Sequence, residues 1–333
     1  MSSNSDRVIP VYGLPRAAPG QTSEPQHALP PPPTKRTRPE HAPAPAPRRA
    51  PSFPAAPASW IVALAAGFAL LLGGCRSRED ASLVRLRESG VIRIGYAVEA
   101  PFAYVSGNQV TGESPEIARI VCRRLGIPHI QWVQMPFDEL IPALRDRRCD
   151  VIAAGMFITD ERRRLIAFSI PTFQVRPGLL VQRGDPHHLG PDSDLARDKA
   201  LHFAVLSGSI EERWFEGHGF KPSQLVIVPD AVTGRAAVEA GMADALALSS
   251  LSIRRLSGGN GATEAILLQP AAGMQPGFGA FGFRLGDKAL RRAWDGVLQT
   301  FVGSAEHRRL VARFGFGPAE IPTLTVASHQ TSR

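Results

Sequence analysis

Short apolar runs alternate with amphipathic segments along the chain from residue 83 onward. Runs of strand length occur at 90–98, 130–133 and 151–156, and the segments 115–126 and 137–148 between them place apolar residues at helical spacing. The predicted order is therefore strand, helix, strand, helix, strand. Such alternation is typical of an α/β fold with a mainly parallel sheet, in which ligands bind beyond the strand ends.

The same alternation restarts in the second half of the chain. Strands are predicted at 177–184, 224–228, 243–249 and 277–284, and helices at 231–240, 287–301 and 305–314. Residues 201–214 are predicted to form a strand, a glycine-containing loop and a helix in that order. If the last elements rejoin the first unit, two strands cross between two lobes and form a hinge beside a ligand cleft. The predicted boundaries are 83–180 with 277–322 for lobe one, 181–276 for lobe two, and 323–333 for a flexible tail.

The first quarter of the chain has a different composition. Fifteen of the 30 prolines fall within residues 10–57, so residues 1–58 are predicted to be disordered. Residues 60–72 carry no charge and follow two arginines. A run of this length matches the core of a signal peptide rather than a membrane span, and we predict a signal peptide at 59–75.

The motif Leu72-Gly73-Gly74-Cys75 resembles the bacterial lipobox, whose cysteine becomes the lipidated first residue of the mature protein. A plain signal peptide and an uncleaved anchor remain alternatives. All three place the remainder outside the cytoplasm. We therefore expect a periplasmic or otherwise extracytoplasmic protein, attached to the membrane through a lipid on Cys75.

The net charge falls by half once the leader is removed. Residues 76–333 hold 31 Lys and Arg against 27 Asp and Glu, a net charge of +4 compared with +8 for the whole chain. The basic residues form no stripe interleaved with aromatic residues. Nucleic-acid binding therefore has little support.

Two cysteines, Cys122 and Cys149, lie in apolar settings near the ends of predicted elements. A disulfide is possible in an oxidising compartment, and two separate buried thiols fit equally well. No Cys/His spacing of a metal site occurs, and the adjacent His187 and His188 cannot face one metal from regular structure. We predict neither a metal nor another cofactor.

Candidate binding chemistry is concentrated in residues 149–164, CDVIAAGMFITDERRR, where a strand ends and a helix opens. Thr159 can cap the first amides of that helix, whereas the arginines behind it place cations at the end that favours anions. A guanidinium grips a carboxylate through two hydrogen bonds, so we interpret Arg162 as a ligand anchor, with Phe157 beside it. The alternative is a solvated arginine run on a surface helix.

Gly277, Gly279 and Gly282 spell G-x-G-x-x-G, but they do not indicate a nucleotide site. The fingerprint requires a helix that opens on the glycines, whereas the next predicted helix begins at 287. Glycine beside phenylalanine in a crossing strand instead predicts close packing and hinge bending.

From residue 83 to 322 the chain resembles the extracellular solute-binding proteins of ABC importers for polar amino acids, family 3, and within it the ectoine-binding members. The resemblance rests on the strand 92–96 and on the motifs GESPEIA (112–118), AAGMFITDERR (153–163), GMADAL (241–246) and GAFGFRLGDKAL (279–290). It implies a type II periplasmic-binding-protein fold, two lobes joined by two crossing strands, and permease and ATPase subunits as partners. It also implies a monomer without catalytic activity.

The resemblance assigns roles to matching positions. The family binds the ligand carboxylate through a Thr-x-x-Arg motif, here Thr159 and Arg162, and through amides after a lobe-two strand, here around Ser207 and Ser209. A strand, glycine loop and helix leave such amides free for an anion. In the amino-acid binders an aspartate holds the ammonium group, and Ser249 stands at that position.

An acid and three aromatic rings accompany Arg162 at the predicted strand ends of lobe one: Glu99, Phe102, Phe137 and Phe157. Phenylalanine rings suit a delocalised cation, with about 0.5 to 2 kcal/mol per contact. A cyclic amidinium carboxylate fits this set, with its ring between the phenylalanines, its N–H groups on Glu99 and its carboxylate on Arg162. Ectoine and hydroxyectoine have that form.

We therefore predict a substrate-binding lipoprotein that captures ectoine or hydroxyectoine for uptake. A polar or cationic amino-acid-binding protein of the same family is the alternative, and Ser249 argues against it. An enzyme on this fold, such as a dehydratase, would need an acid and a base facing the cleft, and only Glu99 is a strong candidate. A receptor sensor domain has less support.

Overall fold

The computed structural model describes residues 80–191, 195, 200–258, 261–269 and 276–323. All of them lie within one compact unit, residues 67–333. The predicted Pro-rich segment 1–58, the signal peptide with Cys75, and all of the predicted tail except residue 323 fall outside the described residues. Those assignments stay predictions. No helix in the described ranges is long and apolar enough to cross a membrane.

The sheet of lobe one has the order β4-β1-β5-β14-β6. Its strands are β1 (Val91–Tyr96), β4 (His129–Gln134), β5 (Val151–Ile152), β6 (Ala167–Phe168) and β14 (Gly282–Phe283). β1 pairs in parallel with β4 and β5, and β14 pairs antiparallel with β5 and β6. The predicted parallel core is therefore confirmed, with a late strand inserted beside it.

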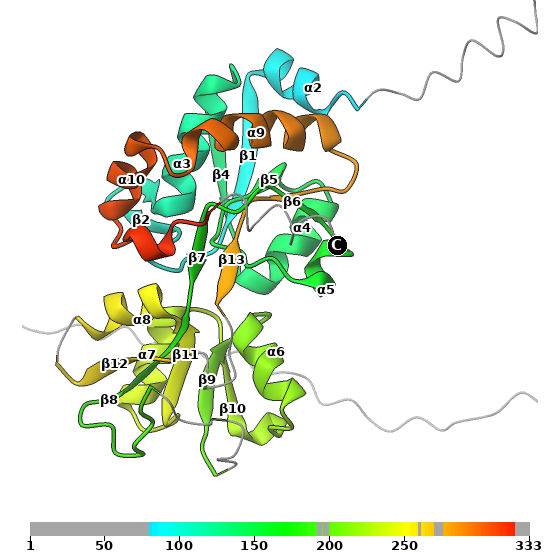
Figure 1. The fold of residues 1–333 in the computed structure, drawn as a ribbon. Coiled ribbons are helices and arrows are strands. Elements are labelled where there is room, and N and C mark those ends of the chain that lie inside the picture. Colours follow the sequence, from blue (N-terminus) through cyan, green and yellow to red (C-terminus); the bar gives the residue numbers. More distant parts are fainter. Residues whose placement is uncertain (1–79, 192–194, 196–199, 259–260, 270–275, 324–333) are drawn as a thin grey trace, which may run out of the picture. The chain divides into compact units, whose positions relative to one another are not determined.

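Helices and a hairpin surround this sheet (Figure 1). They are α2 (Ser82–Ser89), β2 (Tyr104–Ser106), β3 (Gln109–Thr111), α3 (Glu113–Arg124), η1 (Phe137–Glu139), α4 (Leu140–Arg145), α5 (Asp160–Arg163), α9 (Lys288–Phe301), α10 (Ala305–Ala312) and η4 (Pro318–Glu320). Trp294 of α9 is fully buried against Phe281 and Phe283. The C-terminal helices thus complete the core of lobe one, as the sequence predicts.

The sheet of lobe two has the order β10-β9-β11-β8-β12. Its elements are β8 (Pro177–Gln182), β9 (Phe203–Leu206), α6 (Ile210–Gly217), η2 (Pro222–Gln224), β10 (Leu225–Val228), α7 (Ala231–Glu239), β11 (Ala245–Ser249), α8 (Ser250–Ser257) and β12 (Thr263–Leu267). β9 lies parallel to β10 and β11, whereas β8 pairs antiparallel with β11 and β12. This second α/β unit confirms the predicted restart of the pattern.

Two antiparallel strands connect the sheets, β7 (Phe173–Val175) and β13 (Gly277–Gly279). β7 leads into β8 of lobe two, and β13 leads back into β14 of lobe one (Figure 1). Gly279 pairs with Phe173, whose ring occupies the space that a Cβ at position 279 would take. The predicted two crossing strands and their close glycine packing are confirmed.

Two predicted strands are shorter than their apolar runs. The run 151–156 forms a strand only over β5, because the chain turns at Gly155, whose φ is 63° and which packs against the Phe102 ring. The run 277–284 is divided between β13 and β14, which lie in different sheets. In these two segments the apolar run indicates burial and does not indicate an uninterrupted strand.

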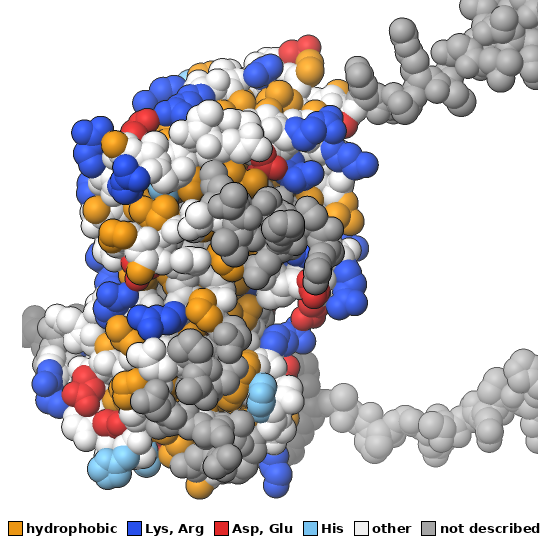
Figure 2. Space-filling model, in the orientation of Figure 1, with side chains coloured by type: hydrophobic (Ala, Val, Ile, Leu, Met, Phe, Trp, Pro, Cys, Tyr) orange, Lys and Arg blue, Asp and Glu red, His pale blue; other side chains and the backbone are white. Residues whose placement is uncertain are grey.

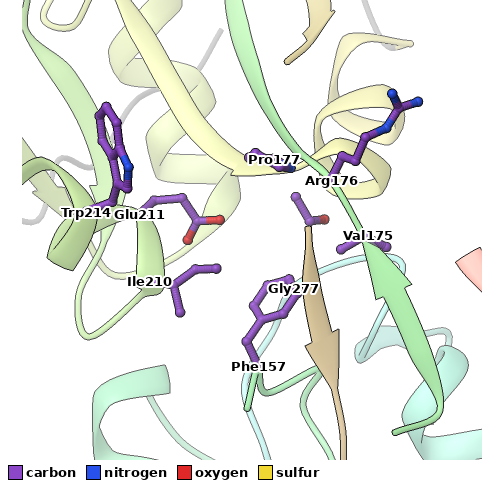
Figure 3. Close-up of a pocket in the computed structure, with 9 residues that line it drawn as sticks. Phe157, Val175, Arg176, Pro177, Ile210, Glu211, Trp214 and Gly277 are labelled. Carbon is purple, nitrogen blue, oxygen red and sulfur yellow. The ribbon is translucent and has the colours of Figure 1, made fainter. Parts of the chain in front are cut away.

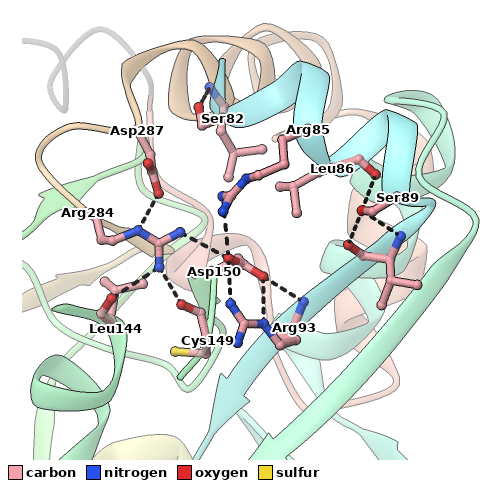
Figure 4. Close-up of polar contacts among 12 residues, drawn as sticks. Ser82, Arg85, Leu86, Ser89, Arg93, Leu144, Cys149, Asp150, Arg284 and Asp287 are labelled. Carbon is pink, nitrogen blue, oxygen red and sulfur yellow. Dashed lines mark hydrogen bonds and ion pairs between the residues drawn. The ribbon is translucent and has the colours of Figure 1, made fainter. Parts of the chain in front are cut away.

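The start of β5 is fixed by a charged cluster around Asp150 (Figure 4). This carboxylate is 2% exposed and accepts hydrogen bonds from Arg93 and, at 3.0 Å, from Arg284. Arg284 also donates to the carbonyls of Leu144 and Cys149. Arg284, which follows β14, therefore connects this strand to α4 and to the start of β5.

Cys122 and Cys149 are both buried, and neither forms a disulfide. Burial raises the pKa of the Cys122 thiol to about 12 and that of Cys149 to about 11. Of the two arrangements that the sequence allows, the structure has separate thiols.

Candidate functional site

Six of the nine predicted ligand-binding residues line one cavity of about 20 Å³: Glu99, Phe137, Phe157, Arg162, Ser209 and Ser249. Its lining also includes Gly155, Leu206, Ile210, Glu211 and Leu248. They come from strand ends and helix starts of both lobes. This volume holds little more than a water molecule. A solute therefore enters only when the lobes or the lining side chains move.

Arg162 is 8% exposed and lies in the wall of this cavity. Its guanidinium donates to the Phe157 carbonyl at 2.8 Å and, from the other lobe, to the Gly208 carbonyl at 2.9 Å. Burial lowers its pKa to about 10, so it stays cationic at neutral pH. The alternative of a solvated run holds for the exposed Arg164 but is wrong for Arg162.

The N-cap of α5 positions this arginine. Thr159 Oγ1 accepts a 3.2 Å hydrogen bond from the Arg162 amide, as the sequence predicts for a helix start. Thr159 itself lines an outer cavity of about 490 Å³ and not the inner one. Its observed role is therefore to place Arg162.

Glu99, in the loop after β1, lines the same cavity. Ser252 Oγ donates a 2.6 Å hydrogen bond to its Oε1, and Ser249 Oγ donates to Ser252 Oγ at 3.1 Å. Burial raises the pKa of Glu99 to about 6, although the Ser252 hydrogen bond opposes this shift. Sequence reasoning missed Ser252, although a Ser249-x-x-Ser252 spacing at the start of α8 was a visible signal.

A second acid, Glu211, also lines the cavity and was missed from the sequence. It lies in the first turn of α6 and is 4% exposed. Burial and the neighbouring Glu99 carboxylate raise its pKa to about 7, while its own amide, Arg162 and Ser209 favour the ionised form. An acid in the first turn of a helix that follows a glycine loop was the available signal.

The three predicted rings do not all face the cavity. Phe137 and Phe157 line it, and the Arg162 guanidinium carbon lies 5.3 Å from the Phe137 ring centroid. Phe102 is 1% exposed and packs in the core against Phe173, with ring centroids 4.7 Å apart. Phe137 and Phe157 therefore lie in the site, whereas Phe102 belongs to the hydrophobic core.

The backbone amides of the loop before α6 already have hydrogen-bond acceptors within the protein. The amides of Ser207, Gly208 and Ser209 donate to the Val228 carbonyl, to Glu212 and to the Leu206 carbonyl. The expectation that these amides are free for an anion is therefore wrong for this structure, because the chain itself supplies the acceptors. Ser209 caps α6, and Ser207 Oγ donates to Asp138 of lobe one at 2.8 Å.

A cavity of about 140 Å³ adjoins the inner one (Figure 3). The two share Phe157, Ile210, Glu211 and Ser249. The larger cavity continues past Trp214 of α6 to Pro177 of β8 and Gly277 of β13. It thus extends the site toward the crossing strands.

Other chemistry has little support. Among the described residues, no group of three His, Cys, Asp or Glu side chains could hold a metal ion. On the face shown in Figure 2, Lys and Arg side chains lie in several separate places and form no continuous stripe.

Comparisons with known proteins show the family. The family described as "Bacterial extracellular solute-binding proteins, family 3" matches residues 92–318. A probable amino-acid ABC transporter periplasmic-binding protein of Sinorhizobium fredii is 30% identical, over 80% of this chain and 91% of its own length. The L-arginine-binding protein of Pseudomonas aeruginosa is 26% identical, over 74% and 95%.

A solved structure, EhuB in complex with hydroxyectoine, is 29% identical with a TM-score of 0.68, and the match covers 76% of this chain and 96% of that one. Such proteins are two-lobed binders associated with transport, and they work with permease and ATPase subunits of an importer. The chain therefore belongs to the bacterial extracellular solute-binding proteins of family 3 and serves an amino-acid-type ABC transporter.

Proposed function

We propose that the solute is a small zwitterion with a delocalised cation, ectoine or hydroxyectoine. The observation that carries the proposal is one half-buried acid, Glu99, and one buried guanidinium, Arg162, in the wall of a single cavity with Phe137 and Phe157. A carboxylate can replace the two carbonyls that Arg162 now contacts. An amidinium can pair with Glu99 beside the rings.

The comparison with solved structures also supports this choice, because EhuB in complex with hydroxyectoine is among the similar structures. The test is calorimetry on the full-length protein with ectoine, hydroxyectoine, arginine, lysine and histidine. We expect binding of ectoine-type solutes at least tenfold tighter than of any amino acid. Tighter binding of an amino acid would overturn the proposal.

A cationic amino acid is the second candidate, and Glu211 favours it. The site holds two acids and one arginine, so a ligand with one carboxylate and two cationic groups would balance all three charges. The arginine-binding relative belongs to that class. The same titration separates the two candidates.

We also propose that the protein acts as a monomer attached to the membrane through a lipid on Cys75. The lipobox-like motif behind an apolar run supports the anchor. Mass spectrometry of the purified protein and of a Cys75→Ala variant tests the lipid, and light scattering tests the oligomeric state.

A further inference from the structure

The cavity of about 140 Å³ has the size of a ring-binding pocket. A cavity of similar volume in another protein accommodates benzene. Its lining is mainly apolar, from Phe157, Val175, Pro177, Ile210 and Trp214. A small ring held by Glu99 and Arg162 can therefore extend a substituent into this space.

Besides Arg176 and Ser249, two polar groups line this mainly apolar cavity, Glu211 and Trp214. Glu211 extends from α6 toward Phe157 and β13 (Figure 3). Trp214, one turn further along α6, has a buried indole N–H with no hydrogen-bond partner among the described residues. A buried donor without an acceptor is costly, so a ligand that supplies one gains affinity.

The chemistry of the pair selects the ligand group. The Glu211 carboxylate, which already accepts from its own amide and from Ser209, can accept a further hydrogen bond, and the Trp214 indole N–H needs an acceptor. An ammonium or guanidinium group only donates, whereas a hydroxyl does both. A neutral group also suits a site in which a zwitterion already matches Glu99 and Arg162.

We infer that Glu211 and Trp214 form a subsite for a hydroxyl group on the solute, so that the protein prefers a hydroxylated cyclic zwitterion over its unsubstituted form. The inference rests on the proposed function and deepens it. A hydrogen bond from a hydroxyl to a buried carboxylate is worth a factor of about 10 to 100 in affinity. Hydroxyectoine and ectoine differ by such a hydroxyl.

The experiment is calorimetric titration of the full-length protein with both compounds. We expect hydroxyectoine to bind at least tenfold tighter than ectoine. Trp214→Phe and Glu211→Gln should each reduce that ratio at least threefold. The control, Glu216→Gln on the exposed face of the same helix, should leave the ratio unchanged. Melting temperatures verify that each variant is folded.

The outcomes separate this inference from the proposed function. If wild type binds both compounds equally, or if the preference survives both substitutions, the subsite is wrong while ectoine-type binding stands. If wild type binds neither compound and binds an amino acid instead, the proposed function fails and the subsite fails with it.

Discussion

Ser252 Oγ lies 2.6 Å from Glu99 Oε1, although 153 residues separate the two side chains. Ser252 belongs to the first turn of α8 in lobe two, and Glu99 follows β1 in lobe one. The hydrogen bond therefore connects the lobes and also orients the acid in the cavity wall. Ser249 Oγ donates in turn to Ser252 Oγ.

Ser252→Ala removes this donor and should weaken binding of a cationic solute near pH 7 by about 1.5 to 3 kcal/mol, the value of a hydrogen bond to a charged group. The Ser252 hydrogen bond lowers the pKa of Glu99, so its loss should raise that pKa above about 6. The pH at which affinity is half-maximal then moves upward, as calorimetry between pH 5 and 8 would measure. Ser257→Ala, on the exposed end of α8, is the control. A pH profile of Ser252→Ala identical to that of the wild type would contradict the role of Ser252 in setting the pKa of Glu99.

Arg162→Ala should cost about 2 to 5 kcal/mol of binding free energy, because the ligand carboxylate is left unpaired in a closed cavity. Arg164→Ala is the matched control, since that side chain is exposed two residues further along. Calorimetry with the tightest solute of the wild type measures both. Undiminished affinity in Arg162→Ala would remove this residue from the site.

Ser249→Asp should shift preference toward α-amino acids. Aspartate can still cap α8 as Ser249 does through the Ser252 amide, so we expect the fold to persist. The added carboxylate lies beside the cavity that Glu99 and Glu211 already line, which favours a second cationic group on the ligand. The ratio of arginine to ectoine affinity should rise at least tenfold, and Ser257→Asp should leave it unchanged. An unaltered ratio would show that position 249 does not select the ligand.

The parts of the fold that follow local rules could be predicted from sequence. β9 and α6 follow in the expected order, and so do Thr159 and α5, because apolar runs and N-caps are short-range signals. The division of 277–284 between two sheets was not visible, since both halves are equally apolar. Only the tertiary partners of each half decide it.

The site shows the same limit. Glu99, Phe137, Phe157 and Arg162 converge as expected because they follow strand ends or helix starts. Phe102 has the same sequence position relative to a strand, yet its ring turns into the core against Phe173. Glu211 was missed because the burial of a helix acid depends on the lobe that faces it.

Glu113 gives a pH-dependent test of the lobe-one core. Its carboxyl is fully buried, Ser114 donates to Oε2 at 2.7 Å, and Oε1 has no partner among the described residues. Burial raises its pKa from its usual 4.5 to about 7. The folded state therefore holds the proton more tightly than the unfolded state, and stability falls as pH rises from about 4.5 through 7.

Replacing this acid should remove its share of the pH dependence. The shift corresponds to about 3 kcal/mol between pH 4.5 and pH 8. Urea unfolding of Glu113→Gln should show a smaller loss of stability over this interval than the wild type. Glu116→Gln on the same helix is the control. Parallel pH curves for wild type and Glu113→Gln would show that folding does not raise the pKa of Glu113.

Gly279→Ala tests the contact at the crossing strands. A Cβ at this position would overlap the buried Phe173 ring, which itself packs against Phe102 and Phe316. Overpacking of this kind costs about 1 to 3 kcal/mol. Because Phe173 starts the strand that leads into lobe two, the added methyl should also alter lobe closure, so solute affinity should fall together with stability.

Gly286→Ala is the matched control, since no atom lies within 4 Å of a Cβ built there. Urea unfolding and calorimetry on both variants measure the two effects, and equal stability of Gly279→Ala and wild type would mean that Phe173 can move aside freely.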